Sequence, residues 1–123
     1  MRRFAPALGA LAALMGAAGV MLAAATTHKG GGDVGQTAAY FLILHAAALM
    51  GVSAWARVDG SRALGVAGAA LGVGTIVFSA DLASRAFSGE RLFPFAAPIG
   101  GSLMILAWVG LAAAFVVGAL RRG

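Results

Sequence analysis

Residues 63–83 read ALGVAGAALGVGTIVFSADLA, an apolar run whose single charged residue, Asp81, lies near its end. At about 1.5 Å per residue, a helix of this length crosses a hydrocarbon core of about 30 Å. Gly65, Gly68 and Gly72 recur at steps of three and four, so they share one face of that helix. Helices in a bilayer associate through small residues that let their backbones approach. The stripe therefore predicts close packing, either within one bundle or against a second copy.

Three further apolar runs accompany this one, at about 4–26, 36–55 and 98–120. Of all residues, 61% are hydrophobic and 11% are charged, whereas about a quarter are charged in an ordinary soluble domain. The four runs and the short turns between them use nearly the whole chain. We therefore expect a single domain, residues 1–123, with an all-α integral membrane fold: a bundle of four transmembrane helices.

The first run has a second interpretation, as a secretory signal. Arg2 and Arg3 precede it, and the three alanines at 23–25 resemble a cleavage site. The apolar region of a signal is about 7 to 15 residues long, however, and the run at 4–26 is longer. We therefore expect it to be kept as a helix.

Basic residues are distributed unequally between the two ends of such a bundle. The end that holds both termini and the middle turn carries Arg2, Arg3, Arg57, Arg62, Arg121 and Arg122. The other end carries Lys29, Arg85 and Arg91, with acidic residues beside them. By the positive-inside rule, both termini then face the cytoplasm. Topology thus accounts for the formal net charge of +5, and no nucleic-acid partner is expected.

Polar residues inside the predicted spans form the first candidate site. His45 lies roughly 12 Å below the outer end of its helix, where a histidine needs a hydrogen-bond partner. Thr75 lies at comparable depth on the third run, one turn deeper than Ser79, and either hydroxyl is a candidate partner. His45 is then an interhelical hydrogen-bonding residue or a proton-carrying or ligand-contacting group. Ligation of haem or metal is less favoured because His28, the other histidine, lies in an outer turn. Trp108 is expected to fill space between helices.

Charged residues at the outer end of the third run form the second candidate site. Asp81 and Arg85 are four residues apart, a spacing that lets them pair along one helix face. The fourth run begins with unpaired backbone N–H groups, which make an electropositive helix end on the same side. The candidate outer-interface site is therefore Asp81, Arg85, Arg91, Gly100 and Gly101. It is either an ion pair that anchors the helix end or a site for a polar headgroup or solute.

Several short motifs resemble those of the YgdD-like family of small four-helix inner-membrane proteins, a class of unknown function with a similar eukaryotic group. The motifs span nearly the whole chain and are Gly16-Ala17-Ala18-Gly19, His45 with Ala46 and Leu49, Phe78-Ser79, and Pro98-Ile99-Gly100-Gly101 with Trp108. The resemblance implies a multi-pass protein of the bacterial inner membrane. It implies no established activity, substrate or cofactor.

The chain departs from the family pattern at three positions. Met21 stands where the family tends to have a histidine, and Leu42 stands where it tends to have a glutamine. Asp81 occupies a position that is usually small and uncharged. A polar network built on the two missing groups is therefore not expected here.

The residue inventory favours a protein that is not an enzyme. The chain has no cysteine, which excludes disulfides, thiolate nucleophiles and cysteine metal sites. Its one set resembling a catalytic triad, Ser79, Asp81 and His45, lies at different depths and on different helix faces. We expect no cofactor and a packing protein that binds membrane lipid, a second copy or a membrane complex. The alternative is a pathway for a small solute or a proton, centred on His45.

Overall fold

The computed structural model describes residues 4–122, without the side chain of Arg122, and consists of four helices. They are α1 (Phe4–Lys29), α2 (Gly32–Ala56), α3 (Arg62–Ser88) and α4 (Ala96–Arg122). Each helix is long and apolar enough to cross a membrane, and the described residues include no strand. The chain is thus a multi-pass membrane protein with the predicted four-helix fold.

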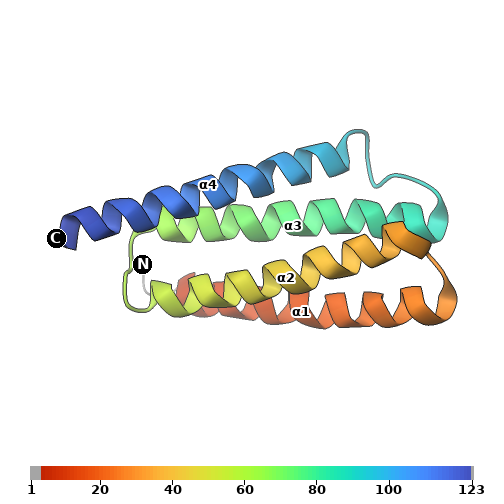
Figure 1. The fold of residues 1–123 in the computed structure, drawn as a ribbon, viewed down its shortest axis with the longest axis horizontal. Coiled ribbons are helices and arrows are strands. Elements are labelled where there is room, and N and C mark those ends of the chain that lie inside the picture. Colours follow the sequence, from red (N-terminus) through yellow and green to blue (C-terminus); the bar gives the residue numbers. More distant parts are fainter. Residues whose placement is uncertain (1–3, 123) are drawn as a thin grey trace.

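Neighbouring helices in the chain are neighbours in space. α1 packs along α2, α2 along α3 and α3 along α4, while α1 and α3 meet over a shorter stretch. The start of α1 and the end of α4 lie at the same end of the bundle (Figure 1). Within the described residues, no Cα atom of α1 or α2 comes within 8 Å of a Cα atom of α4. The backbone of α4 is therefore placed by α3.

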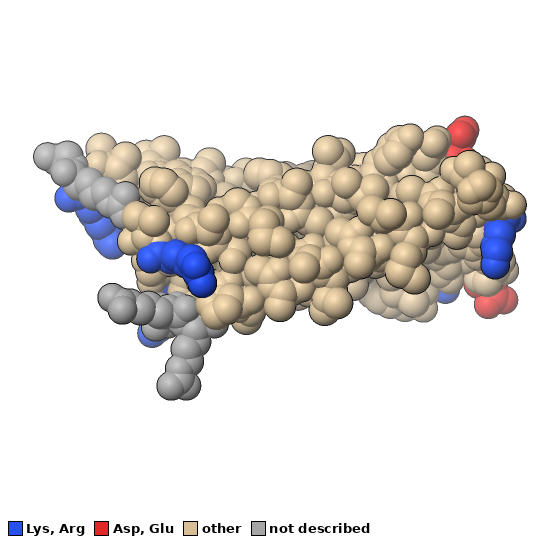
Figure 2. Space-filling model, turned by 90° about the horizontal axis from the view of Figure 1, so that it is seen from below, with Lys and Arg blue, Asp and Glu red and all other residues tan. Residues whose placement is uncertain are grey.

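Charged side chains gather at the two ends of the bundle. On the face shown in Figure 2, basic residues lie at both ends, acidic residues lie at one end, and the surface between carries no charge. The uncharged band matches what a bilayer requires. Of the arginines used to predict orientation, Arg2 and Arg3 and the side chain of Arg122 lie outside the described residues. The cytoplasmic position of both termini stays a prediction.

The helices extend beyond the predicted spans at the outer end. α1 continues to Lys29, and the hydroxyls of Thr26 and Thr27 donate to the carbonyl of Ala23, at 2.9 and 3.0 Å, so both are satisfied within the helix. The chain then turns within two glycines that both have φ of 99°, a conformation open to glycine without strain. As a result α2 begins at Gly32 rather than near residue 36.

The glycine stripe of α3 faces the inside of the bundle. A Cβ atom at Gly65, Gly68 or Gly72 would lie 3.1, 2.9 and 2.6 Å from side-chain atoms of α1. Those atoms belong to Phe4, Leu8 and Leu11. The stripe is therefore occupied by packing within one chain.

A separate pair of glycines brings α3 and α4 together. A Cβ atom at Gly74 would lie 2.9 Å from the carbonyl oxygen of Gly100, and one at Gly100 would lie 2.6 Å from the backbone nitrogen of Phe78. These are contacts with backbone atoms, which cannot rotate aside. The close approach of α4 to α3 thus depends on the absence of side chains at both positions.

Candidate functional site

His45 is hydrogen-bonded through both ring nitrogens. Nδ1 lies 2.8 Å from the carbonyl oxygen of Phe41, and Trp108 Nε1 donates to Nε2 at 3.2 Å. An indole N–H is only a donor, so Nε2 accepts, and the ring proton is on Nδ1, which donates to Phe41. His45 is therefore held as one neutral tautomer, with 8% of its surface exposed.

The partner of His45 differs from the expected one. The hydroxyl of Thr75 donates to the carbonyl of Leu71 in its own helix at 2.7 Å, so it needs no partner on α2. Ser79 makes no hydrogen bond to His45, although both are buried. Among the described residues, the three members of the predicted polar site are thus not joined by any hydrogen bond. Trp108, expected only to fill space, supplies the donor.

Aromatic side chains bridge the gap between α2 and α4. The His45 ring meets the Trp108 ring edge-on at 5.8 Å between centroids. Nearer the inner end, the centroids of Trp55 and Phe115 lie 5.7 Å apart. In the described residues, no Cα atom of α2 lies within 8 Å of a Cα atom of α4. The two helices are therefore linked by these side chains.

The outer end of α3 carries a buried carboxylate. Asp81 is 1% exposed, and its Oδ2 lies 3.3 Å from Nη2 of Arg85, the ion pair that their spacing predicts. Its other oxygen, Oδ1, accepts from the backbone N–H of Leu92 at 2.7 Å. Asp81 therefore fastens the loop between α3 and α4 onto α3, a role the sequence did not suggest.

Serine hydroxyls fasten the start of the same loop. Ser84 donates to the carbonyl of Glu90 at 2.7 Å, and Ser88 donates to the carbonyl of Ser84 at 2.7 Å. The backbone N–H of Glu90 donates to Ser88 Oγ at 3.3 Å, and Gly89 turns the chain with a φ of 76°. The loop that carries Arg91 is thus tied to the end of α3.

A pocket of about 480 Å³ lies between the outer ends of α3 and α4. It is lined by Phe78, Arg85, Arg91, Ala97, Pro98, Gly101, Ser102 and Ile105. Three residues of the predicted outer-interface site, Arg85, Arg91 and Gly101, therefore meet here. Asp81 supports Arg85 without lining the pocket, and Gly100 is used in packing against α3.

The helix end beside this pocket offers fewer donors than the sequence indicated. The N–H of Ala96 donates to the carbonyl of Phe93 at 3.2 Å, and Pro98 has no N–H. Within the described residues, Ala97 has the remaining first-turn N–H without an acceptor. The two arginines, rather than the helix end, therefore dominate the charge of the outer pocket.

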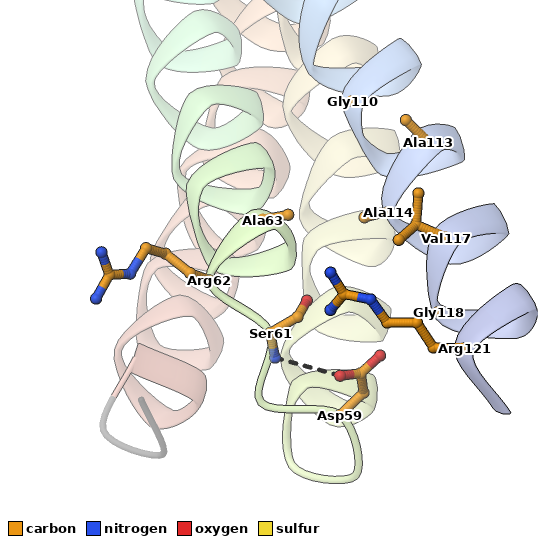
Figure 3. Close-up of a pocket in the computed structure, with 10 residues that line it drawn as sticks. All are labelled: Asp59, Ser61, Arg62, Ala63, Gly110, Ala113, Ala114, Val117, Gly118 and Arg121. Atoms are coloured by element: carbon orange, nitrogen blue, oxygen red, sulfur yellow. Dashed lines mark hydrogen bonds between the residues drawn. The ribbon is translucent and has the colours of Figure 1, made fainter.

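A second pocket, of about 460 Å³, lies at the inner end and was not predicted. It is lined by Asp59, Ser61, Arg62, Ala63, Gly110, Ala113, Ala114, Val117, Gly118 and Arg121. Figure 3 shows Arg121 reaching from α4 towards Asp59 and Ser61, whereas Arg62 points away from them. Ser61 accepts from the N–H of Leu64 at 3.2 Å and so caps α3. Small residues recur at steps of four on α4, at Gly110, Ala114 and Gly118. This spacing is the feature of the sequence that could have predicted the pocket.

Comparison with known proteins places the chain in a family without a described activity. A family model described as Protein of unknown function (DUF423) matches residues 8–101. The match covers α1 from residue 8, all of α2 and α3, and the glycines at the start of α4, and it agrees with the predicted resemblance to a family of unknown function. No curated protein and no solved structure was found to be similar.

Proposed function

We propose that this chain, which belongs to the DUF423 family of proteins of unknown function, binds the phosphate of a lipid headgroup in the outer pocket between α3 and α4. It does so as a non-enzymatic protein of the bacterial inner membrane, with both termini in the cytoplasm. The observation that carries the proposal is the meeting of Arg85 and Arg91 in one pocket at the end of a membrane-spanning helix.

The charge of the pocket favours an anion. Arg85 directs Nη2 to Asp81, but its side chain is 33% exposed and lines the pocket, so the guanidinium, which has five N–H donors, keeps donors beyond the ion pair. Arg91 adds a second, exposed guanidinium, and one carboxylate cannot neutralise two arginines. Glu90 is exposed and does not line the pocket. Arginine is also the side chain whose geometry best fits phosphate oxygens.

The depth of the pocket matches a headgroup. Leu92, Phe93 and Phe95 are exposed in the loop beside it, and apolar and aromatic side chains on a membrane protein's end favour the interface with the bilayer. Pocket residues Phe78 and Ile105 extend the lining towards the hydrocarbon core. A phosphate beside the arginines would therefore leave its acyl chains against apolar surface.

The geometry gives less support to a proton or solute pathway through His45. Both ring nitrogens are occupied, one by a backbone carbonyl and one by an indole N–H. Moving a proton through the ring requires breaking one of these bonds. Self-association through the α3 stripe is also less favoured, because the bundle itself occupies the stripe.

Lipid retention tests the proposal. The purified protein is placed in nanodiscs of phosphatidylcholine with a minor fraction of phosphatidylglycerol, and the lipid that stays bound after transfer to detergent is identified by native mass spectrometry. Arg85→Gln and Arg91→Gln should each weaken retention about fivefold, since an arginine near a membrane surface contributes about 1 kcal/mol. Arg57→Gln at the inner end is the matched control and should retain lipid as the parent does. Unchanged retention in a variant that carries both Arg85→Gln and Arg91→Gln would refute the proposal.

A further inference from the structure

The loop between α3 and α4, residues 89–95, returns along the bundle instead of extending from its end. The N–H of Leu92 donates to Asp81 Oδ1 at 2.7 Å, so Leu92 lies at the level of Asp81. α3 continues past Asp81 as far as Ser88, which at 1.5 Å per residue is roughly 10 Å further along the axis. Figure 1 shows the same course, with the loop running back from the end of α3 to the start of α4. The chain has therefore returned by about two helical turns when it reaches Leu92.

The start of α4 lies at the same level. A Cβ atom at Gly100 would meet backbone atoms of both Gly74 and Phe78, so Gly100 lies between these two residues of α3. α4 begins at Ala96, roughly 6 Å before Gly100. The same distance along α3, measured outward from the point opposite Gly100, ends close to Asp81. A hydrogen bond and a helix contact thus agree that this end of the loop lies beside Asp81.

Asp81 marks the outer boundary of the hydrocarbon. From Arg62, at the inner end of α3, to Asp81 is roughly 28 Å along the helix, close to the thickness of a hydrocarbon core, about 30 Å. Beyond this level the ends of α1, α2 and α3 carry polar side chains, among them Lys29, Asp33 and Ser88. The loop therefore returns from the polar ends of three helices to the surface of the hydrocarbon.

The side chains at this end of the loop are large, apolar and exposed. The exposed fractions of Leu92, Phe93 and Phe95 are 50, 41 and 68%. Phe95 is also the one non-glycine residue in the described chain with a positive φ, 64°, which is an unfavourable conformation for phenylalanine. Strain held at a particular residue points to a function of that residue. An aromatic ring there gains free energy if it leaves water for hydrocarbon.

Backbone groups at the same end of the loop are hydrogen-bonded within the protein. The carbonyl oxygens of Phe93 and Phe95 accept from N–H groups in the first turn of α4, at 3.2 and 2.9 Å. The N–H of Leu92 has its acceptor in Asp81. Hydrocarbon offers no partner to a backbone group, so irregular chain at its surface needs partners from the protein. The buried carboxylate of Asp81 meets this requirement.

We propose that the loop inserts Leu92, Phe93 and Phe95 into the outer surface of the bilayer, where they contact acyl chains just below the headgroups. Arg91 precedes the three apolar residues and keeps its charge at the level of the headgroups. Asp81 is the positioning residue, because it holds the backbone of Leu92 at that depth. The insertion follows from the course of the loop and does not require a lipid bound in the outer pocket.

The depth of the loop can be measured without measuring lipid retention. Single cysteines replace Glu90, Phe93, Phe95 or Leu106, the last at an exposed position within α4, in a chain that has no natural cysteine. Each is given a nitroxide label, and the protein is placed in phosphatidylcholine vesicles. Electron paramagnetic resonance then measures collisions of the label with oxygen, which concentrates in hydrocarbon, and with a neutral nickel chelate, which stays in water.

Labels on Phe93→Cys and Phe95→Cys should behave like the label on Leu106→Cys. Their ratio of nickel to oxygen collisions should be about tenfold below that of Glu90→Cys, because a polar chelate is excluded from hydrocarbon. Each of these two loop variants keeps the other aromatic ring, so the loop retains an apolar anchor.

A second change tests the role of Asp81. Asp81→Leu removes the acceptor of Leu92 and should raise the ratio at Phe93→Cys towards that of Glu90→Cys. Asp81→Asn keeps an acceptor oxygen and should leave the ratio low. An unchanged ratio in Asp81→Leu would show that the carboxylate does not hold the loop in the bilayer.

Two results would overturn the insertion itself. A ratio at Phe93→Cys and Phe95→Cys equal to that of Glu90→Cys means that the loop lies in water. Few collisions with either reagent mean that a protein surface, and not lipid, covers the two positions. The ratios should be the same in a chain that also carries Arg85→Gln and Arg91→Gln, so a failure of headgroup binding leaves the result in place.

Discussion

At the level of single residues, His45 and Trp108 each supply the hydrogen-bond partner that the other needs. An imidazole nitrogen and an indole N–H both need partners in hydrocarbon, and they meet at 3.2 Å although 63 positions separate them in the chain. The remaining imidazole nitrogen is satisfied inside α2 by Phe41. The pair thus joins two helices without leaving a polar atom unpaired.

Trp108→Phe should therefore destabilise the bundle, because it removes the indole donor and leaves the buried Nε2 of His45 without a hydrogen-bond partner. Hydrogen bonds between transmembrane helices contribute about 0.6 kcal/mol on average and up to about 1.7, and we expect a loss of about 1 kcal/mol. Unfolding in mixed micelles measures it, and a double-mutant cycle with His45→Leu should show that the two changes are not additive. Tyr40→Phe, at an exposed position of α2, is the control. Additive effects would show that the pair is not coupled.

Asp81→Leu should free the loop between α3 and α4, because Leu92 loses its acceptor and Arg85 loses its partner. Asp81→Asn keeps an acceptor oxygen for Leu92 and should free the loop less. Hydrogen exchange of the loop amides measures the effect, with faster exchange at Leu92 in the leucine variant. Protection equal to that of the parent would show that the carboxylate does not hold the loop.

At the level of helices, α3 uses different glycines for different neighbours. Gly65, Gly68 and Gly72 admit side chains of α1, while Gly74 receives the backbone of α4 at Gly100. Side chains can shift to make room, but a backbone atom in a helix cannot. The α3–α4 contact is therefore the more sensitive of the two.

Gly100→Ala should weaken the attachment of α4 by about 1 to 3 kcal/mol, the usual cost of overpacking. The added methyl group would lie 2.6 Å from the nitrogen of Phe78 and 2.8 Å from the carbonyl oxygen of Gly74. Gly51→Ala is the matched control, since nothing lies within 4 Å of its added atom. It should leave stability unchanged or raise it through helix propensity. Equal unfolding curves for the two variants would contradict this account.

The sequence predicted the helices well and their contacts poorly. Hydropathy determined which segments cross the membrane, but the helices continue past the apolar runs, where Thr26, Thr27 and Ser88 satisfy their hydroxyls on carbonyls of their own helices. Such local bonds leave no trace in hydropathy. The partner of His45 depended on how α4 rotates about α3, which Gly74 and Gly100 determine and no periodicity records. By contrast, Asp81 and Arg85 pair because their spacing within one helix is fixed.

At the level of the molecule, charge is confined to the two ends. Three described arginines lie at the predicted inner end: Arg57, Arg62 and Arg121. The outer end carries Lys29, Arg85 and Arg91. A bundle of this kind has one orientation that suits the positive-inside rule. The orientation also decides which leaflet supplies the lipid for the outer pocket.

Cysteine accessibility measures that orientation directly, because the natural chain contains no cysteine. Val58→Cys lies in the turn after α2, and Glu90→Cys lies in the loop after α3, both at exposed positions. An impermeant maleimide should label the Glu90 variant on the outer face of intact spheroplasts and the Val58 variant only after permeabilisation. The reverse pattern would place both termini outside.

The backbone of α4 packs closely against α3 and not against α1 or α2, and this has a consequence for the order of assembly. A chain made from its N-terminus completes α1, α2 and α3 first, and these three helices already share their buried glycine and leucine contacts. The last helix then enters a membrane in which its docking surface is formed. We therefore expect α4 to join last, when Ala107 and Leu111 complete the buried core.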